Sequence, residues 1–283
     1  MSVKIIADST CDLSKELLER YDISVLPLHI VLGDKEYKDG LEISPDEIYQ
    51  WSDENNAAPK TSAASISDAM EIFSNYIKTH DEIICFSISG QMSTTSNVMR
   101  MAAEELECED IIHIIDSENL STGGGLLVIE AAIMAAEGKG GREIVNAIEQ
   151  LKPQVRASFI VDTLTFLHRG GRCSGIAALA GGALKLHPKI VVENGAMKPD
   201  KKYRGKMNSA ILTYAKDLEM QLKNAKTDRV FITHSGCEEE TVQSIYSFLK
   251  ELNLFNEILI TRAGGVISSH CGPGTLGVLF IEN

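Results

Sequence analysis

Residues 3–13, VKIIADSTCDL, join a short apolar run to a polar cluster, and a helical pattern follows. The run Val3–Ala7 has the length and the apolar content of a buried strand. The cluster Asp8–Asp12 is rich in residues that form turns and helix caps. Apolar residues then recur at helical spacing, at Leu13, Leu17, Leu18 and Tyr21. This order predicts a strand, a loop and a helix, which is the first unit of an α/β fold.

The same alternation continues through the first half of the chain. Further apolar runs predict strands at Val25–Leu32, Ile83–Phe86 and Ile111–Ile115. Segments with helical spacing separate these runs, at Ile66–Ile77, Thr95–Leu106 and Leu120–Ala136. Because parallel neighbours require crossover helices, we expect a mostly parallel sheet with helices on both faces. Ligands on such sheets bind at the carboxyl ends of the strands.

The composition changes after Leu151-Lys152-Pro153, and we place a domain boundary near residue 155. The sequence therefore predicts an N-terminal α/β domain at residues 1–155 and a C-terminal α/β domain at residues 156–283. The second half contains an Asn194-Gly195 turn and ends in a strand at 275–281 that no crossover helix precedes. These features indicate an α+β-like domain whose sheet is partly antiparallel.

Net charge and cysteine content exclude several classes of protein. Lys and Arg number 27 against 40 Asp and Glu, which gives a formal net charge of −13. Such a surface repels nucleic acid and anionic lipid headgroups, and no apolar stretch reaches the roughly 20 residues of a membrane helix. The 6 cysteines form no CxxC pair and show no zinc spacing. We therefore expect a cytoplasmic protein with reduced thiols, without a nucleic acid partner and without membrane insertion.

Sequence motifs for nucleotide, hydrolase and metal chemistry are absent. There is no GxGxxG or GxxxxGK[ST] loop, no GxSxG elbow and no HExxH helix, so we expect neither a cofactor nor a metal ion. Two hydroxyl-rich loops remain, at 59–65 and 87–96. Helix capping explains each loop on pattern alone, and the alternative is that both present hydroxyls to one anionic ligand. Asp8 and Asp116 follow predicted strands, and we interpret both as residues that close turns.

Five short motifs, spread from one end of the chain to the other, occur together in one known family. They are Ile6–Leu13, Pro59–Ser62, Ile115–Ser117, Gly171–Ser174 and His270–Gly274. The chain resembles the DegV family, bacterial proteins that bind fatty acids. The resemblance implies two α/β domains with a long-chain fatty acid, such as palmitate, in a buried tunnel between them. It also implies a carrier without catalytic activity that presents its ligand to a separate fatty acid kinase, for lipid metabolism or transport.

The resemblance also assigns roles to single residues. Thr61 and Ser93 match the two hydroxyl residues that hold the fatty acid carboxylate. Arg172 and His270 match residues near that headgroup. Arg204 falls in a basic stretch that such carriers share, which makes it the candidate for kinase contact or phosphoryl handling.

The chemistry of a fatty acid suits these residue types. Each buried methylene contributes about 0.8 kcal/mol, so the tail provides the affinity. Burying the carboxylate is costly unless hydroxyl donors and a cation surround it. Ser89 offers a competing alignment for the second hydroxyl. The small-residue segment Ile176–Leu184 would suit a tunnel wall, although close packing of a core helix explains it equally well.

Two other functions fit the same residues. An acyl-ester hydrolase or a phosphotransferase could use Ser93 with His270. A structural or regulatory protein could hold an empty cleft at the same place. Turnover that depends on Ser93 would identify the enzyme, and the absence of any bound lipid would favour the regulatory protein.

Overall fold

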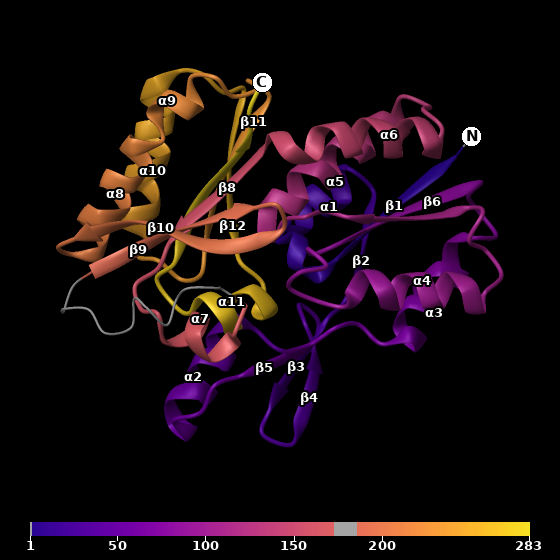
Figure 1. Cartoon of the computed structure of the whole chain (residues 1–283), viewed down its shortest axis with the longest axis horizontal. Helices are drawn as coiled ribbons and strands as arrows, with labels where there is room; N and C mark the ends of the chain where they lie inside the picture. Colours follow the sequence, from indigo (N-terminus) through magenta and orange to yellow (C-terminus); the bar gives the residue numbers. More distant parts are fainter. Residues whose placement is uncertain (1, 173–185) are drawn as a thin grey trace.

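The computed structural model describes residues 2–172 and 186–283, which form three β-sheets with helices packed around them (Figure 1). Four strands of the first half form a sheet in the order β2-β1-β6-β7, and every pairing in it is parallel. These strands are β1 (Val3–Asp8), β2 (Ile23–Leu26), β6 (Glu82–Ser87) and β7 (Ile112–Asp116). The parallel sheet expected for the first half is therefore confirmed.

Helices cover both faces of this sheet, with α5 and α6 on one side and α3 and α4 on the other (Figure 1). A hydrophobic core lies on each face of the sheet, and alternate residues of β1 point into one or the other. Ile5 packs with α5 and α6, whereas Ile6 packs with α3 and α4. The helical elements of this half are η1 (Ser9–Cys11), α1 (Lys15–Arg20), α3 (Ile66–Tyr76), α4 (Thr95–Glu105), α5 (Ser121–Ala136), α6 (Gly141–Leu151) and η2 (Lys152–Gln154).

A small antiparallel sheet that the sequence did not predict interrupts the first half. Its order is β4-β3-β5, formed by β3 (His29–Leu32), β4 (Lys35–Lys38) and β5 (Lys60–Ser62), and α2 (Pro45–Asn55) lies between β4 and β5 in the chain. The expectation of one strand at Val25–Leu32 is wrong. Pro27 has no N–H group for a sheet ladder, so the run divides into β2 and β3, which belong to different sheets.

The second half forms a mixed sheet of six strands in the order β10-β9-β8-β13-β11-β12. The pair β11 and β12 is parallel and the other pairings are antiparallel, which confirms the partly antiparallel sheet. Its strands are β8 (Val155–Ile160), β9 (Leu186–Glu193), β10 (Ala196–Arg204), β11 (Arg229–His234), β12 (Glu257–Arg262) and β13 (Leu276–Ile281). This sheet begins at Val155, and the division of the chain into two domains at that residue stays a prediction.

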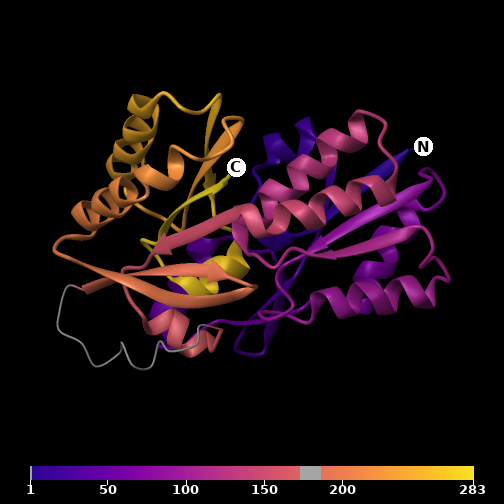
Figure 2. The ribbon, with the colours of Figure 1, turned by 45° about the horizontal axis from the view of Figure 1, so that its top comes forward.

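The two faces of the six-stranded sheet have different neighbours. On one face, α8 and α10 pack against β11 and β13, whereas α11 and the start of α5 lie on the other (Figure 2). The helices of this half are α7 (Thr165–Gly170), α8 (Met207–Asp217), α9 (Glu219–Leu222), α10 (Glu239–Leu252) and α11 (Gly265–Cys271). The tunnel wall predicted at Ile176–Leu184 lies outside the described residues. Across the described ranges, no helix is both long enough and apolar enough to cross a bilayer.

Helix α5 joins the two large sheets because it packs against both. Its core contains Ile5 and Phe86 of the first sheet together with Phe231 and Leu279 of the second. Three consecutive glycines in its first turns, Gly123, Gly124 and Gly125, are buried. A Cβ atom at Gly125 would lie 2.7 Å from the carbonyl oxygen of Cys11, so the glycine is what lets α5 approach the loop after β1.

Two buried carboxyl groups, Asp12 in the loop after β1 and Asp39 just after β4, connect distant segments. Asp12 accepts a hydrogen bond from the N–H of Gly264 at 2.8 Å, and Asp39 accepts one from the N–H of Gly265 at 2.7 Å. These N–H groups begin α11, where partial positive charge favours carboxylates. Burial nevertheless dominates, and it raises the pKa of Asp12 to about 8 and shifts the pKa of Asp39 upward.

The raised pKa of Asp12 predicts that the protein loses stability as pH rises, and that replacing the carboxyl group with an amide removes this loss. The folded protein holds a proton on Asp12 up to about pH 8, whereas an unfolded Asp releases it near 3.8. Between pH 4 and pH 8 only the unfolded chain releases this proton. The free energy of unfolding therefore falls as pH rises through this window, by at most about 1.4 kcal/mol per pH unit. We expect Asp12→Asn to gain stability relative to the parent across this window, as measured by urea unfolding.

The exposed Asp53→Asn on α2 is the control, and its stability should follow the parent at every pH. Parallel pH profiles for Asp12→Asn and the parent would contradict the buried, proton-holding state of Asp12.

Candidate functional site

Thr61 lies on the short strand β5, opposite Ile30 of β3. The sequence placed it in a loop before a helix, and the structure instead holds its backbone in the small antiparallel sheet. Ser65, four residues on, performs the capping role, because its hydroxyl accepts the N–H of Asp68 at 3.0 Å. The Thr61 hydroxyl is therefore not used as a cap, and its Oγ1 lies 2.7 Å from Nε2 of His270.

His270 lies near the carboxyl end of α11 and is held between the two halves of the chain. One ring nitrogen contacts Thr61, and the other, Nδ1, is buried without a hydrogen-bond partner among the described residues. Gly170 packs against Nδ1 so closely that any side chain at 170 would overlap the ring. Burial, reinforced by the positive charge of Arg172, lowers the pKa of His270 to about 4. The imidazole is therefore neutral at physiological pH.

Ser93 lies in the loop between β6 and α4, and its hydroxyl is near the first turn of the helix. Its Oγ lies 2.8 Å from Oγ1 of Thr95 and accepts the N–H of Thr95 at 3.3 Å. The competing hydroxyl, Ser89, is fully buried and donates to the carbonyl of Gly195 at 2.7 Å. Ser93 therefore faces the space beside Thr61 and His270, whereas the β9–β10 turn occupies the Ser89 hydroxyl.

Arg172 supplies a positive charge at the same place. Its guanidinium donates to the carbonyl of Gly170 at 2.6 Å, and the side chain is exposed. Arg172 lines the same cavity as His270, and its positive charge helps to lower the pKa of that imidazole. The hydroxyl, imidazole and guanidinium groups expected at one site thus lie together.

These four residues line one cavity of about 420 Å³ between the two halves of the chain. This volume is within the range of small-molecule sites, roughly 300–1,000 Å³. Thr61 and His270 are in contact on this wall. Ser62, Gln91 and Thr94 also line the cavity, and its apolar lining consists of Leu28, Ile88, Met92, Leu120, Met197, Val266, Ile267 and Cys271. A cavity of this kind suits a ligand with one polar group and a long apolar part.

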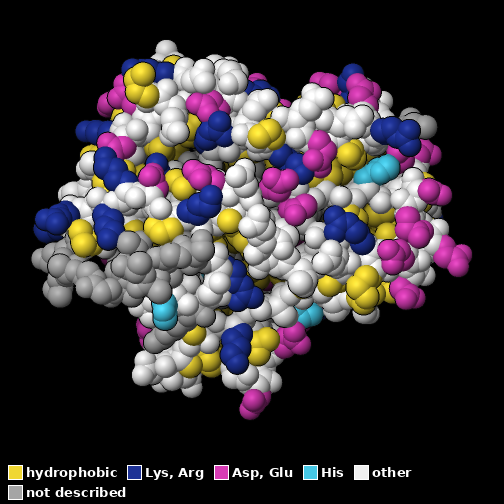
Figure 3. Space-filling model, viewed as in Figure 1, with side chains coloured by type: hydrophobic (Ala, Val, Ile, Leu, Met, Phe, Trp, Pro, Cys, Tyr) yellow, Lys and Arg dark blue, Asp and Glu magenta, His cyan; other side chains and the backbone are white. Residues whose placement is uncertain are grey.

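Arg204 lies apart from this cavity. It is the last residue of β10 and is exposed, and it pairs with Leu186 across the hairpin. Other exposed cations share the strand, at Lys198, Lys201 and Lys202. Figure 3 shows Lys and Arg side chains over this side of the molecule, while many Asp and Glu side chains lie over the half with the four-stranded sheet.

Asp8 and Asp116, the last residues of β1 and β7, make long-range contacts that the sequence did not reveal. Asp8 closes a turn as predicted, because it accepts the N–H of Thr10 at 3.0 Å. It also accepts the N–H of Ile88 at 2.7 Å and so holds the loop that carries Ser93. Asp116 likewise closes its own turn at Glu118 and accepts the N–H of Gly90. The backbone of one loop of the cavity wall, at Ile88 and Gly90, is thus held by the buried Asp8 and the partly exposed Asp116.

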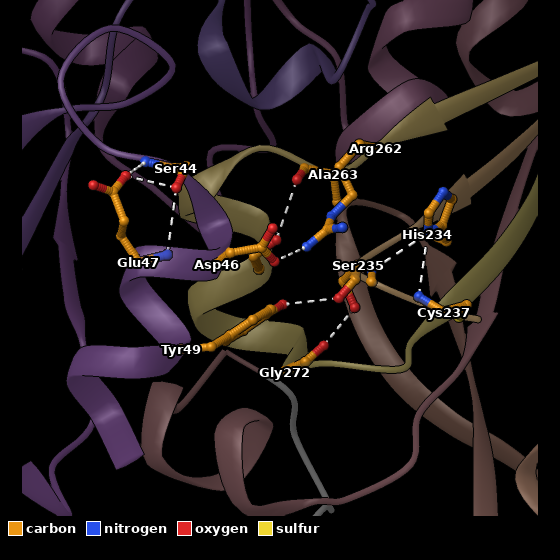
Figure 4. A network of polar contacts seen from close by, with 12 residues as sticks. Ser44, Asp46, Glu47, Tyr49, His234, Ser235, Cys237, Arg262, Ala263 and Gly272 are labelled. Atoms are coloured by element: carbon orange, nitrogen blue, oxygen red, sulfur yellow. Dashed lines mark hydrogen bonds and ion pairs between the residues drawn. The ribbon is translucent and has the colours of Figure 1, made fainter. Parts of the chain in front are cut away.

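A second set of polar contacts holds α2 against the ends of β11 and β12 (Figure 4). Arg262 donates to Asp46 at 2.6 Å, and the Tyr49 hydroxyl donates to the carbonyl of Ser235 at 3.2 Å. Ser235 in turn donates to the carbonyl of Gly272, just after α11, at 2.5 Å. These bonds hold the carboxyl end of α11, near His270. Asp12 and Asp39 hold the other end of the same helix.

Comparison with known proteins identifies the family. A model of the family described as "Uncharacterised protein, DegV family" matches residues 2–283. The chain belongs to the DegV family. A DegV domain-containing protein of Caldanaerobacter subterraneus is 32% identical over 282 residues, which cover 99% of each chain.

Solved structures of DegV proteins share the fold over their whole length. A fatty acid binding DegV family protein from Thermus thermophilus matches with a TM-score of 0.92 and 30% identity, covering 100% of both chains. A stearic acid-binding protein from Eubacterium ventriosum matches with a TM-score of 0.85 and 27% identity, covering 99% of this chain and 98% of the other. The resemblance stated from the sequence motifs is confirmed.

The arrangement of the site argues against hydrolysis through Ser93. A serine nucleophile needs a hydrogen bond to its general base. Here the Ser93 hydroxyl contacts Thr95, and the imidazole of His270 contacts Thr61 instead. Within residues 2–172 and 186–283, no group of three or more His, Cys, Asp or Glu side chains is arranged to hold a metal ion.

The neutral state of His270 is directly measurable. In ligand-free protein we expect its ring protons, followed by NMR, to titrate with a pKa of about 4. Arg172→Gln should raise this pKa because it removes a nearby positive charge, but burial should keep the value below 6.5. Arg100→Gln, on the exposed face of α4, is the matched control and should leave the titration unchanged. A parent pKa at or above 6.5 would contradict the buried, neutral imidazole.

Proposed function

We propose that this protein binds a long-chain fatty acid, such as palmitate, in the cavity between its two halves. The single observation that carries the proposal is the lining of that cavity, in which Thr61, Ser93, Arg172 and His270 share one space with many apolar side chains. The fatty acids named for the Thermus and Eubacterium proteins support the same ligand class for this relative. Buried methylenes supply the affinity, at about 0.8 kcal/mol each.

In this proposal the carboxylate binds to the hydroxyls of Thr61 and Ser93. With its proton on Nε2, the neutral imidazole of His270 donates to Oγ1 of Thr61, which leaves the Thr61 hydroxyl free to donate to the ligand. Thr95 can act on Ser93 in the same way across 2.8 Å. Arg172 supplies the compensating charge for a carboxylate that has left water. No cofactor is needed for binding of this kind.

We further propose that the protein is a carrier and that catalysis belongs to a separate fatty acid kinase. Such a kinase would transfer the γ-phosphoryl group of ATP to a carboxylate oxygen of the bound acid, releasing ADP and giving an acyl phosphate. The lack of a phosphate-binding loop in this chain is consistent with that division. The exposed cations of β10, with Arg204 at its end, are our candidate contact for the kinase.

The carboxylate assignment is tested by extraction of bound acid and mass spectrometry. We expect the parent to carry one acid per chain. Thr61→Ala and Ser93→Ala should each weaken binding roughly ten- to hundredfold, because a hydrogen bond to a charged group contributes about 1.5–3 kcal/mol. Ser89→Ala is the matched control, since its hydroxyl is bonded to Gly195 and should not touch the ligand.

Two outcomes would overturn these assignments. A parent that neither carries nor takes up fatty acid would reject the ligand class. A loss of binding in Ser89→Ala with none in Ser93→Ala would move the second hydroxyl to Ser89.

The role of Arg204 is tested with a purified fatty acid kinase and loaded carrier. We expect Arg204→Glu to retain the parent affinity for fatty acid, because Arg204 does not line the cavity. Formation of acyl phosphate from the loaded variant should be slower, because the charge of the proposed contact is reversed. Arg100→Glu serves as the control for a charge reversal elsewhere on the surface. Equal rates for all three proteins would place the kinase contact away from β10.

A further inference from the structure

The apolar side chains that line the candidate cavity are buried. They are Leu28, Ile88, Met92, Leu120, Met197, Val266, Ile267 and Cys271. None of the eight is more than 8% exposed. Protein interiors are close-packed, so an acyl chain does not pass between such side chains while they keep their positions. Entry or exit of a long apolar ligand therefore requires that part of the wall moves.

One part of this wall, the tip of the β9–β10 hairpin, extends beyond its neighbouring strand. The strand β10 is the edge of the six-stranded sheet, and β9 pairs with β8 only over Lys189–Val191. The pairing within the hairpin continues to Glu193 and Ala196, where the Asn194-Gly195 turn closes it. The hairpin tip, residues 192–197, is therefore paired within itself but not with β8.

A cavity of about 380 Å³ lies where β8 and β9 separate. Val155–Ala157 of β8 line it on one side, and Val192–Asn194 of the hairpin tip line it on the other. The same residues of β8 still pair with β13, so the gap arises because β9 leaves the sheet. Met197, also in the hairpin tip, lines the candidate cavity instead. The hairpin tip thus lies between the two cavities.

Two side-chain hydrogen bonds hold the hairpin tip against the first half of the chain. Oγ of Ser89 donates to the carbonyl of Gly195 at 2.7 Å, and Nε2 of Gln91 donates to the carbonyl of Asn194 at 2.6 Å. Both donors belong to the loop that carries Ser93. Figure 2 shows the orange hairpin reaching toward that half of the molecule. These two bonds can break without the loss of any pairing within a sheet.

We propose that the hairpin tip is a gate of the ligand cavity and that Ser89 and Gln91 are its latch. This inference rests on the proposed fatty acid function. When the two bonds break, the hairpin tip moves into the cavity beside β8 and carries Met197 away from Ile88 and Met92, with which it packs. The apolar lining is then open to the tail of an entering or leaving acid. When the bonds form again, the tail is enclosed.

A reversible cross-link between the hairpin tip and the loop tests the gate. A Cβ atom at Gly195 would lie 2.7 Å from Oγ of Ser89, so cysteines at positions 89 and 195 are close enough to form a disulfide. We expect the oxidised Ser89→Cys/Gly195→Cys protein to exchange labelled palmitate for unlabelled acid roughly tenfold more slowly than the same protein after reduction. Mass spectrometry verifies the disulfide.

Gly195→Cys alone is the control for this cross-link, because Gly195 has a φ of 79° that strains any other residue. Under the same oxidant it should exchange acid at the rate of its reduced form. Equal exchange rates for the oxidised and reduced forms of the double variant would overturn the inference.

Gln91→Ala tests the latch without a cross-link, and it replaces the cysteine variant if that protein does not fold. Loss of one hydrogen bond should increase the population of the open hairpin tip, and so both the uptake and the release rate, by roughly two- to tenfold. Faster release with unchanged uptake would show that Gln91 only contacts the ligand, and would overturn its role as a latch. Gln50→Ala, which removes an exposed hydrogen bond to Glu54 on α2, is the matched control and should leave both rates unchanged.

The inference and the proposed function fail in different experiments. Hydrogen exchange of delipidated protein follows the hairpin tip without any ligand. We expect Gln91→Ala to speed exchange of the amides at 192–197 and to leave those of β8 at the parent rate. Unchanged exchange in the hairpin tip would overturn the gate whether or not acid binds. A parent that binds no fatty acid would reject the proposed function, and the role of the hairpin tip as a gate for acid would fall with it.

Discussion

The hydrogen bonds that Asp12 and Asp39 accept from the N–H groups at the start of α11 constrain the rest of the structure. They place a short helix of the second half against the loop after β1 at the cost of burying two carboxylates. The same helix presents His270 to Thr61, so its position decides whether the candidate site exists. A seven-residue helix has little stability of its own, and external bonds at its first turn therefore matter more than its sequence.

A site formed from distant segments needs such constraints because no single segment fixes the positions of the others. Thr61 and His270 are 209 positions apart, and Ser93 comes from a third element. Asp8 holds the loop of Ser93 through the N–H of Ile88, and Arg262 and Tyr49 hold α2 against the ends of β11 and β12. The cavity walls are thus fixed by backbone and side-chain bonds that lie outside the cavity itself. Cavity shape is in this sense a property of the whole fold.

The sequence predicted the elements well where periodicity is strong and poorly where partners are distant. The parallel first sheet follows from alternating strands and helices, and the partly antiparallel second sheet follows from the Asn194-Gly195 hairpin. The prediction of one strand at Val25–Leu32 overlooked Pro27, which by itself indicates that the run is divided. No local pattern could show that Asp39 bonds Gly265, because 226 positions separate them. Likewise, no local pattern could show that the Ser89 hydroxyl donates to the carbonyl of Gly195, a residue of the other half.

The neutral imidazole of His270 explains how such a site could favour an anion and still release it. A charged His270 beside Arg172 would make the empty site strongly positive, and burial would make that charge costly. With a neutral ring, Arg172 alone balances one carboxylate, and the ring acts through the Thr61 hydroxyl. In the proposed complex, hydrogen bonds would orient the carboxylate and the tail would supply the affinity. Because these two contributions would come from different residues of the cavity, the proposed site could accept tails of different length without any change at Thr61 and His270.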